Sequence, residues 1–180
     1  KKKTIEFKTN IQLEAVDFSY QNSNEKALEN VNLSINKGEI VAIIGDSGSG
    51  KTTLINLILG FISPDSGAVT VDNQNIQKNL ENWQSKLGYV PQDVYVMDET
   101  LKKNIVFGIP EDQVNEKLMH EVIKKTRLET FVNSLPKKLN SNIGNVGSKI
   151  SGGQKQRIGI ARALYTCPEI LILDEATNSL

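Results

Sequence analysis

The order of apolar and polar positions predicts several strands in the first half of the chain. Residues 11–20 and 31–35 alternate apolar with polar side chains, which is typical of antiparallel strands that bury one face. Residues 40–44 form a continuous apolar run, which predicts a parallel strand buried on both faces. Shorter strands are expected at 68–72, after a turn cluster, and at 87–91, where a proline ends the strand.

After about residue 93 the pattern becomes helical. Apolar side chains recur at helical spacing within 100–105, 114–126 and 151–165, and no clear strand interrupts the first two segments. Ser151 is a favourable N-cap for the last of these helices. A second apolar run at 170–173 predicts another buried strand. The pattern therefore predicts an α/β fold with a mixed sheet, an N-terminal antiparallel β-subdomain and an inserted helical subdomain.

Length and composition fit one ordinary globular domain. The 180 residues are 38% hydrophobic and 23% charged, and the formal net charge is zero, so a nucleic-acid partner is not expected. The apolar runs are far shorter than the roughly 20 residues that span a bilayer. The single cysteine, Cys167, excludes an internal disulfide and is expected to pack rather than react. Because the chain lacks a starting Met and stops just after a motif, it is expected to be part of something longer.

A complete phosphate-binding loop lies between the apolar run 40–44 and a helix-like segment at 54–58. Glycine allows the backbone angles that turn successive N–H groups toward a phosphate, and the helix N-terminus adds its positive dipole end. In this motif the lysine reaches the β- and γ-phosphates and the hydroxyl after it binds Mg²⁺. The alternative is a Gly/Ser-rich turn before a helix. We therefore expect a nucleoside triphosphate to bind at Gly45, Asp46, Ser47, Gly48, Ser49, Gly50, Lys51, Thr52 and Thr53.

Two further motifs extend this prediction. The run 170–173 ends in Asp174 and Glu175, and an acidic residue at the carboxyl end of a parallel strand can hold Mg²⁺ opposite the Thr52 hydroxyl. Glu175 would then be free to orient or deprotonate a water molecule. The second motif is Ser151, Gly152, Gly153 and Gln154, where the glycines leave the first helical turn open to an anion. Taken alone, each motif has a plain alternative: acids commonly begin helices after strands, and Ser151 can be an ordinary cap.

Taken in order, the phosphate loop, Gln92, residues 150–154 and residues 170–175 resemble the ATP-binding domain of ABC transporters, over about residues 11–180. The resemblance implies ATP and Mg²⁺ as cofactors and an ATPase activity coupled to transport. It also implies that residues 1–92 and 166–180 form the ATP-binding core and β-subdomain of a single domain. Residues 93–165 would then form the helical subdomain that carries the signature motif.

The resemblance implies roles for further residues. Tyr20 would stack on adenine, the alternative being a tyrosine at a strand end that packs into the core. Gln92 would sense Mg²⁺ and the γ-phosphate and link to the membrane domain. Asp174 would be the Mg²⁺-site aspartate and Glu175 the catalytic glutamate, while Ser151–Gln154 would contact the ATP of a second domain. His120 lies in the expected helical insertion and is predicted on a helix surface. Because it is upstream of the position of the switch histidine, it does not take that role.

Within this family the stretch from residue 91 to 105 resembles exporters, whose ATP-binding domain is fused to membrane helices and lies at the cytoplasmic face. The implied partners are that membrane domain and a second ATP-binding domain in a head-to-tail, ATP-dependent dimer. Ile150 stands in place of the usual Leu, a conservative change, and Asn145 stands where exporters usually carry the Glu of a charged contact with the partner's membrane domain. Because the chain ends before the expected position of the switch histidine, the isolated piece is expected to hydrolyse ATP weakly or not at all. The alternatives are a soluble ABC ATPase and a fragment that binds nucleotide without hydrolysing it.

Overall fold

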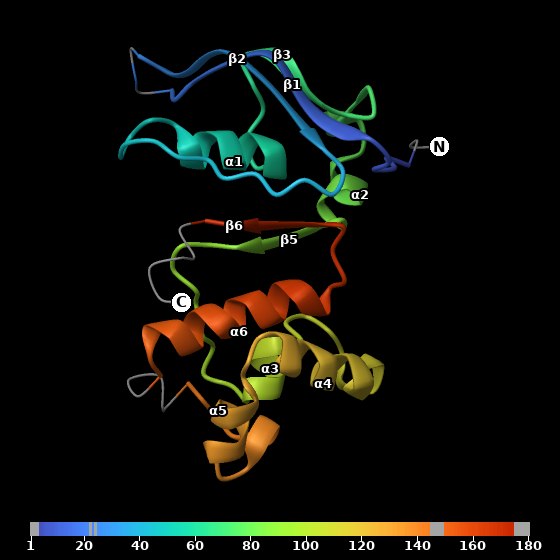
Figure 1. Cartoon of the computed structure of the whole chain (residues 1–180), viewed down its shortest axis with the longest axis vertical. Coiled ribbons are helices and arrows are strands. Elements are labelled where there is room, and N and C mark those ends of the chain that lie inside the picture. Colours follow the sequence, from blue (N-terminus) through green and yellow to red (C-terminus); the bar gives the residue numbers. More distant parts are fainter. Residues whose placement is uncertain (1–3, 22, 24, 145–149, 175–180) are drawn as a thin grey trace. The chain divides into compact units, whose positions relative to one another are not determined.

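The computed structural model describes residues 4–21, 23, 25–144 and 150–174. The chain divides into two compact units, Lys1–Leu87 and Gly88–Leu180 (Figure 1). Buried hydrophobic residues and regular secondary structure occur in both units.

Unit 1 is built on a four-stranded antiparallel sheet with the strand order β2-β1-β3-β4. The expected alternation is present in β1, where Ile11, Leu13, Val16 and Phe18 are all buried. The pairing register of β1 with β2 shifts between Leu13 and Val16. Ala15, which lies between them, has a φ of 47°, so the extended backbone of the strand is interrupted at this residue. The bounds of the strands are β1 Asn10–Ser19, β2 Lys26–Asn36, β3 Ser66–Val71 and β4 Gln74–Asn75.

Helix α1 (Lys51–Leu59) follows the phosphate loop and buries its apolar side chains within unit 1. It ends at Gly60, whose φ of 70° suits a glycine C-cap. A short 3₁₀ helix, η1 (Ile76–Asn79), leads into α2 (Leu80–Gln84). Trp83 on α2 is fully buried, and its indole N–H donates to the Ile58 carbonyl at 2.7 Å. This hydrogen bond fixes α2 to the C-terminal end of α1.

The apolar run 40–44 differs from the prediction, because the structure contains no strand there. Ile40 and Ile44 are 101% and 92% exposed, and Val41 and Ile43 are also exposed. A strand exists only where neighbouring backbones supply hydrogen bonds, and among the described residues of unit 1 the sheet consists of β1–β4. The prediction of a strand buried on both faces was therefore wrong for this structure.

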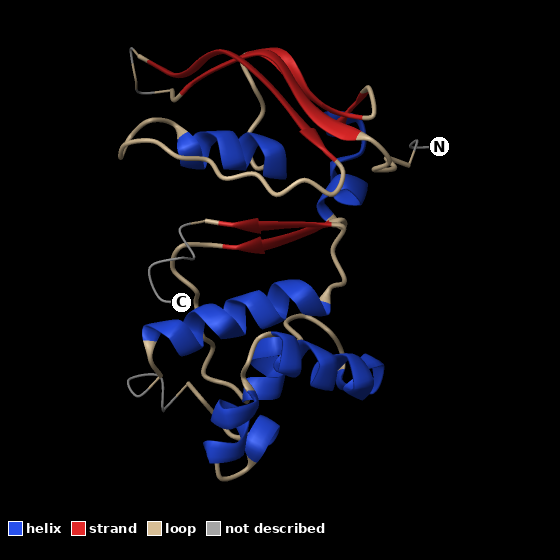
Figure 2. Cartoon of the chain, viewed as in Figure 1, coloured by secondary structure: helices blue, strands red, loops and turns tan. Residues whose placement is uncertain are grey.

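Unit 2 is mainly helical, with the two strands β5 and β6 forming a separate small sheet (Figure 2). Figure 1 shows the arrows of both strands pointing the same way, with α6 between them in the sequence. The expected helices at 100–105, 114–126 and 151–165 are present, and α5 is an additional one. The elements are β5 Leu87–Val90, α3 Leu101–Ile105, η2 Glu111–Gln113, α4 Glu116–Lys125, α5 Glu129–Ser134, η3 Lys138–Asn140, α6 Gly152–Tyr165 and β6 Ile170–Leu173.

The core of unit 2 lies among its helices. Ile158 and Ala161 of α6 are fully buried, as are Leu101 on α3 and Met119 on α4. The side chain of Tyr165, the last residue of α6, is buried, and its hydroxyl accepts a hydrogen bond from the Asn115 backbone N–H at 2.8 Å. Helix α6 is therefore the element against which the shorter helices pack.

Two details of unit 2 differ from the prediction. Strand β6 is present, but Leu171 and Leu173 are 40% and 44% exposed, so the strand is not buried on both faces. Within the described residues β6 pairs only with β5, which leaves one of its edges without a strand partner. Cys167 is exposed with a φ of 52° in the turn before β6, so the expectation that it packs was also wrong.

Candidate functional site

The phosphate loop occupies residues 45–50 and leads directly into α1. Gly48 and Gly50 have φ values of 83° and 88°, the left-handed region that glycine reaches without strain. The Lys51 ammonium folds back over the loop and donates to the carbonyls of Gly45 at 2.8 Å and Asp46 at 2.7 Å. These carbonyls are neutral acceptors, and an anionic phosphate would be a stronger partner for the same ammonium group.

The geometry of the loop fits a phosphate group. A Cβ atom at Gly45 would lie 2.6 Å from the Ser49 Oγ, and one at Gly50 would lie 2.6 Å from the Ala27 carbonyl oxygen. At Gly50 the clash would be with backbone and φ is 88°, so this tight path requires glycine there, whereas at Gly45 the Ser49 side chain would have to move. The N-terminus of α1 has no side-chain cap at Gly50, so its first N–H groups are not satisfied in that way. Such groups, together with the helix dipole, form an anion-binding site.

Tyr20 lies just beyond the end of β1 and close to the phosphate-loop helix. Its hydroxyl is 3.0 Å from the Oγ1 of the buried Thr53, and its ring meets Phe18 edge-on with centroids 5.0 Å apart. Tyr20 is 48% exposed, so it is not the core residue of the alternative interpretation. The neighbouring Thr52 is exposed on the first turn of α1. Unit 1 thus brings the exposed ring of Tyr20, the ammonium group of Lys51 and the exposed side chain of Thr52 to one end of α1.

The signature residues open α6 in unit 2, as predicted. Ser151 is the N-cap, and its hydroxyl oxygen accepts a hydrogen bond from the Gln154 backbone N–H at 3.2 Å. The Gln154 side chain in turn accepts from the Ser151 backbone N–H at 2.9 Å. This capping box satisfies two N–H groups and leaves the Ser151 hydroxyl proton available to a ligand. Gly152 is exposed and Gly153 partly so, which keeps the first turn open to an anion.

Gln92 and Asp174 follow the adjacent strands β5 and β6. The Asp174 N–H donates to the Val90 carbonyl at 2.9 Å, so the two strand ends are held together. Gln92 is exposed, two residues beyond Val90. Glu175 lies outside the described residues. Both strands therefore deliver their polar residues at their carboxyl ends, as the sequence predicted for a ligand site on such a sheet.

Tyr89 is a residue of this site that the sequence did not reveal. Its hydroxyl donates to the Asp174 Oδ2 at 3.4 Å. Partial burial, and after it the charge of Asp174, raise the pKa of Tyr89, so the phenol stays a neutral donor at physiological pH. In the sequence Tyr89 was visible only as a residue of a predicted strand three positions before Gln92, which does not show where its side chain points. The structure adds Tyr89 as a group that contacts the aspartate expected to bind Mg²⁺.

No group of three or more His, Cys, Asp or Glu side chains able to hold a metal ion occurs in the described ranges. A Mg²⁺ ion that accompanies nucleotide does not need such a group, because it binds substrate phosphates, waters and one or two side chains. A hydroxyl and a carboxylate are suitable ligands for it. Thr52 and Asp174 each carry a group of this kind, so each fits the ion in its chemistry.

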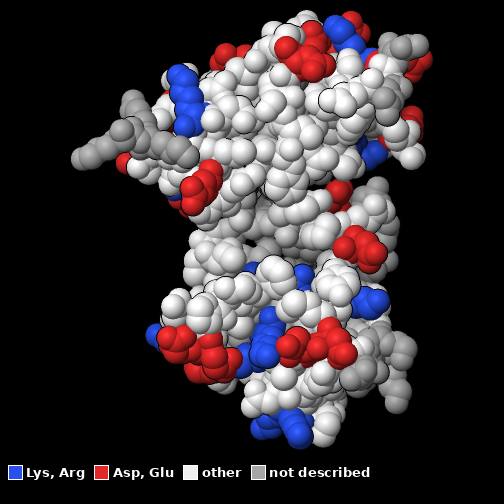
Figure 3. All heavy atoms as spheres, turned by 180° about the vertical axis from the view of Figure 1, so that it is seen from behind, with Lys and Arg blue, Asp and Glu red and all other residues white. Residues whose placement is uncertain are grey.

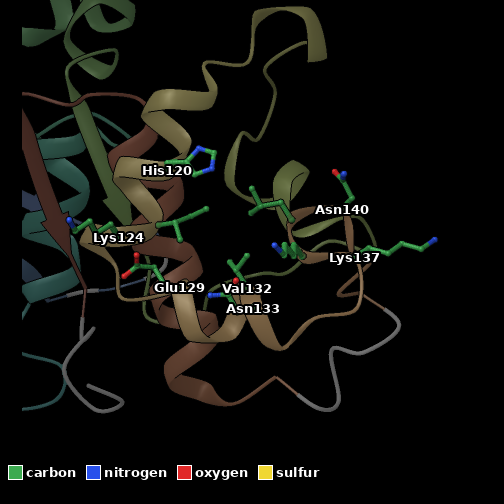
Figure 4. Close-up of a pocket in the computed structure, with 10 residues that line it drawn as sticks. His120, Lys124, Glu129, Val132, Asn133, Lys137 and Asn140 are labelled. Carbon is green, nitrogen blue, oxygen red and sulfur yellow. The ribbon is translucent and has the colours of Figure 1, made fainter.

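An open hollow in unit 2 is separate from these motifs (Figure 4). It lies between α4, α5 and η3, and its wall includes His120, Lys124 and Glu129. His120 is exposed on α4, as expected, and its Nδ1 is 2.7 Å from the Glu116 carbonyl oxygen. Figure 4 shows the Lys137 side chain directed away from the hollow. None of the predicted site residues lines it, so it is not the expected nucleotide site.

Comparisons with known proteins agree with the motifs. The family described as "ABC transporter" matches residues 28–178. A multidrug resistance ABC transporter ATP-binding and permease protein of Lactococcus lactis is 42% identical over 166 residues, which are 92% of this chain and 28% of that protein. An ATP-dependent lipid A-core flippase of Ralstonia nicotianae is 38% identical over 172 residues, 94% of this chain and 29% of that protein.

A solved structure is also similar to this chain. It is a bacterial Atm1-family ABC exporter with ATP bound, with a TM-score of 0.90 and 32% sequence identity, covering 98% of this chain and 31% of that one. The chain thus spans less than a third of the length of these relatives. In the part of the chain that the structure describes, no helix is long and apolar enough to cross a bilayer.

Proposed function

This chain belongs to the ABC transporter family as an ATP-binding domain of the exporter type, and we propose that it binds Mg-ATP and hydrolyses it to drive export across a membrane. The observation that carries the proposal is the phosphate loop. The Lys51 ammonium lies against the glycine-containing loop 45–50, and the helix that follows has no side-chain cap at its N-terminus. The positive charge and the uncapped helix N-terminus both favour an anion.

The residues of unit 1 would bind and orient the nucleotide. Lys51 exchanges its two carbonyl partners for the β- and γ-phosphates, which are better acceptors because they are charged. The Thr52 hydroxyl provides one oxygen ligand for Mg²⁺. Tyr20 offers its half-exposed ring to the adenine, and the bond to Thr53 keeps that ring beside α1.

The residues of unit 2 would complete the reaction site. Bound Mg²⁺ supplies charge neutralisation for the phosphates. Asp174 binds this ion directly or through water, and the Tyr89 hydroxyl holds one of its carboxylate oxygens. Gln92, two residues beyond the end of β5, is proposed to sense the ion and the γ-phosphate. Glu175 accepts a proton from the attacking water as general base.

The N-terminus of α6 would act on a second nucleotide. We propose that Ser151, Gly152, Gly153 and Gln154 contact the γ-phosphate bound to another copy of this domain, in a head-to-tail dimer. In the capping box the Ser151 hydroxyl is an acceptor, so its proton stays available to a ligand, and the N-terminus of α6 favours an anion. Since ATP would lie between the two surfaces, the dimer would depend on it.

The remaining proposals concern the complete protein. Relatives that carry "ATP-binding and permease" in their names combine both parts in one chain, and we propose a membrane domain as the second partner of this domain. The domain would then lie at the cytoplasmic face of the membrane. Residues 1–92 with 166–180 are proposed to form the ATP-binding core and β-subdomain, and residues 93–165 the helical subdomain. No nucleic-acid partner is proposed, and Figure 3 shows acidic and basic side chains interspersed on the face that it draws.

Replacing Glu175 tests the proposed chemistry. In the full-length protein Glu175→Gln is expected to retain ATP binding and to lose hydrolysis, because an amide occupies the same space but does not accept a proton. Glu121→Gln, an exposed change on α4, is the matched control. Binding is measured by titration with Mg-ATP and turnover by phosphate release. Wild-type turnover in Glu175→Gln would assign the general base to another residue.

A further inference from the structure

The segment from Pro91 to Thr100 joins β5 to α3 without a helix or strand, and Gln92 is its second residue. Such a connection is expected to be mobile unless side chains hold it. Here Val94 is 5% exposed, although Gln92 and Tyr95 on either side of it are exposed. We call residues 92–100 the glutamine-loop segment. Three contacts, all within unit 2, hold it against the rest of the fold.

The first contact is between Val94 and α6. A Cβ atom at Gly159 would lie 2.6 Å from the Val94 Cγ2 and 3.2 Å from the Val90 Cγ1. Gly159 is buried in the middle of α6, where glycine weakens a helix by about 1 kcal/mol relative to alanine. The absence of a side chain at this position is what allows Val94 to approach the helix so closely.

The second contact is made by Asn104 on α3, whose side chain is completely buried. Its Oδ1 accepts a hydrogen bond from the Met97 N–H at 2.8 Å. Its Nδ2 lies 3.1 Å from the Met97 carbonyl, 3.3 Å from that of Glu99 and 3.1 Å from that of Thr100. One amide group therefore bonds to three residues at the end of the glutamine-loop segment.

The third contact is Arg162 on α6, which links the other two. Its Nε donates to the Asn104 carbonyl at 2.9 Å, and its Nη2 donates to the Tyr95 carbonyl at 3.0 Å. Its guanidinium carbon also lies 5.5 Å from the centre of the Phe107 ring. Burial lowers the pKa of Arg162. In the described ranges no carboxylate forms an ion pair with it, so neutral carbonyls and one ring are its partners.

We propose that Arg162 is a positioning residue for ATP hydrolysis: it fixes the glutamine-loop segment to α6, so that Gln92 and the Ser151 end of α6 belong to one rigid unit. This inference rests on the proposed function. The planar fork of an arginine can bond to two carbonyls from different segments, whereas a lysine ammonium is a single point. Arg162 is half-buried and its partners are neutral, so its partial desolvation is not offset by an ion pair, and stability alone does not account for an arginine here.

The plain alternative is that Arg162 only helps α3 and α6 to pack. Packing would be satisfied by an aliphatic side chain, and it would not require a bond to Tyr95, which lies outside α3 and α6. The two interpretations differ in where a substitution takes effect. A positioning role concentrates the effect on the glutamine-loop segment, while a packing role spreads it over the core of unit 2.

The test compares three variants of the full-length protein by hydrogen exchange of the backbone amides. Arg162→Lys keeps the charge and the aliphatic stem but loses the fork. Gly159→Ala strengthens α6 and presses its Cβ against Val94, so it should loosen the same segment by a different route. Thr126→Val is the control, because it removes a buried hydroxyl that donates to the Val122 carbonyl, away from the segment.

Arg162→Lys is expected to speed exchange in residues 93–100 about tenfold, the size of effect that losing one hydrogen bond to a charged donor produces. Gly159→Ala is expected to speed exchange in the same residues, because its Cβ displaces Val94. Exchange in α4 should stay unchanged. The kcat for Mg-ATP should fall about fivefold or more while KM changes less than about twofold, because the substitution misplaces a reacting group rather than a binding one. Thr126→Val should produce neither change in the segment nor a fall in kcat.

Exchange that rises evenly across unit 2, or a pattern identical to that of Thr126→Val, would overturn the proposal. Faster exchange in 93–100 with unchanged kcat would also overturn it, since the segment would then be held without positioning anything. If the wild-type protein does not hydrolyse ATP, the proposed function fails. The exchange pattern would in that case still show whether Arg162 fixes the segment.

Discussion

At the scale of single residues, Asp72 ties the N-terminal segment to the turn between β3 and β4. Its carboxylate accepts hydrogen bonds from the backbone N–H groups of Lys8 at 2.6 Å, Thr9 at 2.8 Å and Asn10 at 3.0 Å, and from the Thr9 hydroxyl. Partial burial raises the pKa of Asp72, but these four hydrogen bonds outweigh it and lower the pKa to about 2. The charged form is thus the one that the fold favours.

The low pKa of Asp72 predicts how stability depends on pH. The folded pKa lies below the ordinary value of 3.8, so the contribution is present above pH 4 and is lost as the pH falls through 4 toward 2. Asp72→Asn should destabilise the protein by about 1 to 2 kcal/mol at pH 7. The difference should shrink by pH 3. Urea unfolding at both pH values, with the exposed Asp112→Asn as control, measures this. An equal difference at both values would contradict the assignment.

Single residues also mark the limit of prediction from sequence. The N-cap role of Ser151 was predictable, because capping depends on neighbours a few residues away, and the structure confirms it. The contact of Tyr89 with Asp174 joins residues 85 positions apart, and that of Arg162 with Tyr95 joins residues 67 apart. Local patterns carry no information on such pairs.

At the scale of elements, α6 begins with the residues that are proposed to contact ATP, so its cap has two separable roles. Ser151→Ala should lower stability by about 1 kcal/mol, whereas Ser151→Gly should lower it by only a few tenths. Both variants lose the hydroxyl and should therefore lose ATP turnover to a similar extent. Chemical unfolding and phosphate release are measured on the same samples.

The comparison of the two Ser151 variants separates capping from catalysis. Turnover that follows stability, with Ser151→Gly close to wild type, would reduce Ser151 to a helix cap. Equal loss of turnover with unequal stability would support a direct contact with nucleotide. The control is Asn115→Ala at the N-cap of α4, whose side-chain Oδ1 accepts from the Leu118 N–H at 3.0 Å and lies at no predicted phosphate site.

Secondary structure was predictable where its cause is local. The alternation in 11–20 and the helical spacing in 114–126 and 151–165 produced β1, α4 and α6 close to the expected bounds. The apolar runs 40–44 and 170–173 were both predicted as buried strands. Residues 40–44 form no strand and are exposed, while residues 170–173 form a strand that is only partly buried. Burial of a strand depends on partners elsewhere in the chain, which an apolar run does not identify.

At the scale of the whole molecule, the proposed function predicts that association depends on nucleotide. If ATP lies between Gly45–Thr53 of one copy and Ser151–Gln154 of another, the two protein surfaces are not complementary without it. The 180-residue chain should therefore sediment as a monomer without nucleotide and as a dimer when the Glu175→Gln variant is saturated with Mg-ATP. A stable dimer without nucleotide would contradict the proposed arrangement.

The most direct test of the central claim is the affinity for Mg-ATP of Lys51→Ala, measured by titration calorimetry beside the wild-type protein. Lys51 now bonds to the carbonyls of Gly45 and Asp46, and we propose that phosphates replace them. Its loss should weaken binding about 100-fold, as expected for a charged hydrogen-bond donor worth up to about 3 kcal/mol. Lys78→Ala, an exposed lysine on η1, should bind like the wild type. Unchanged affinity in Lys51→Ala would contradict the claim that this loop holds the phosphates of ATP.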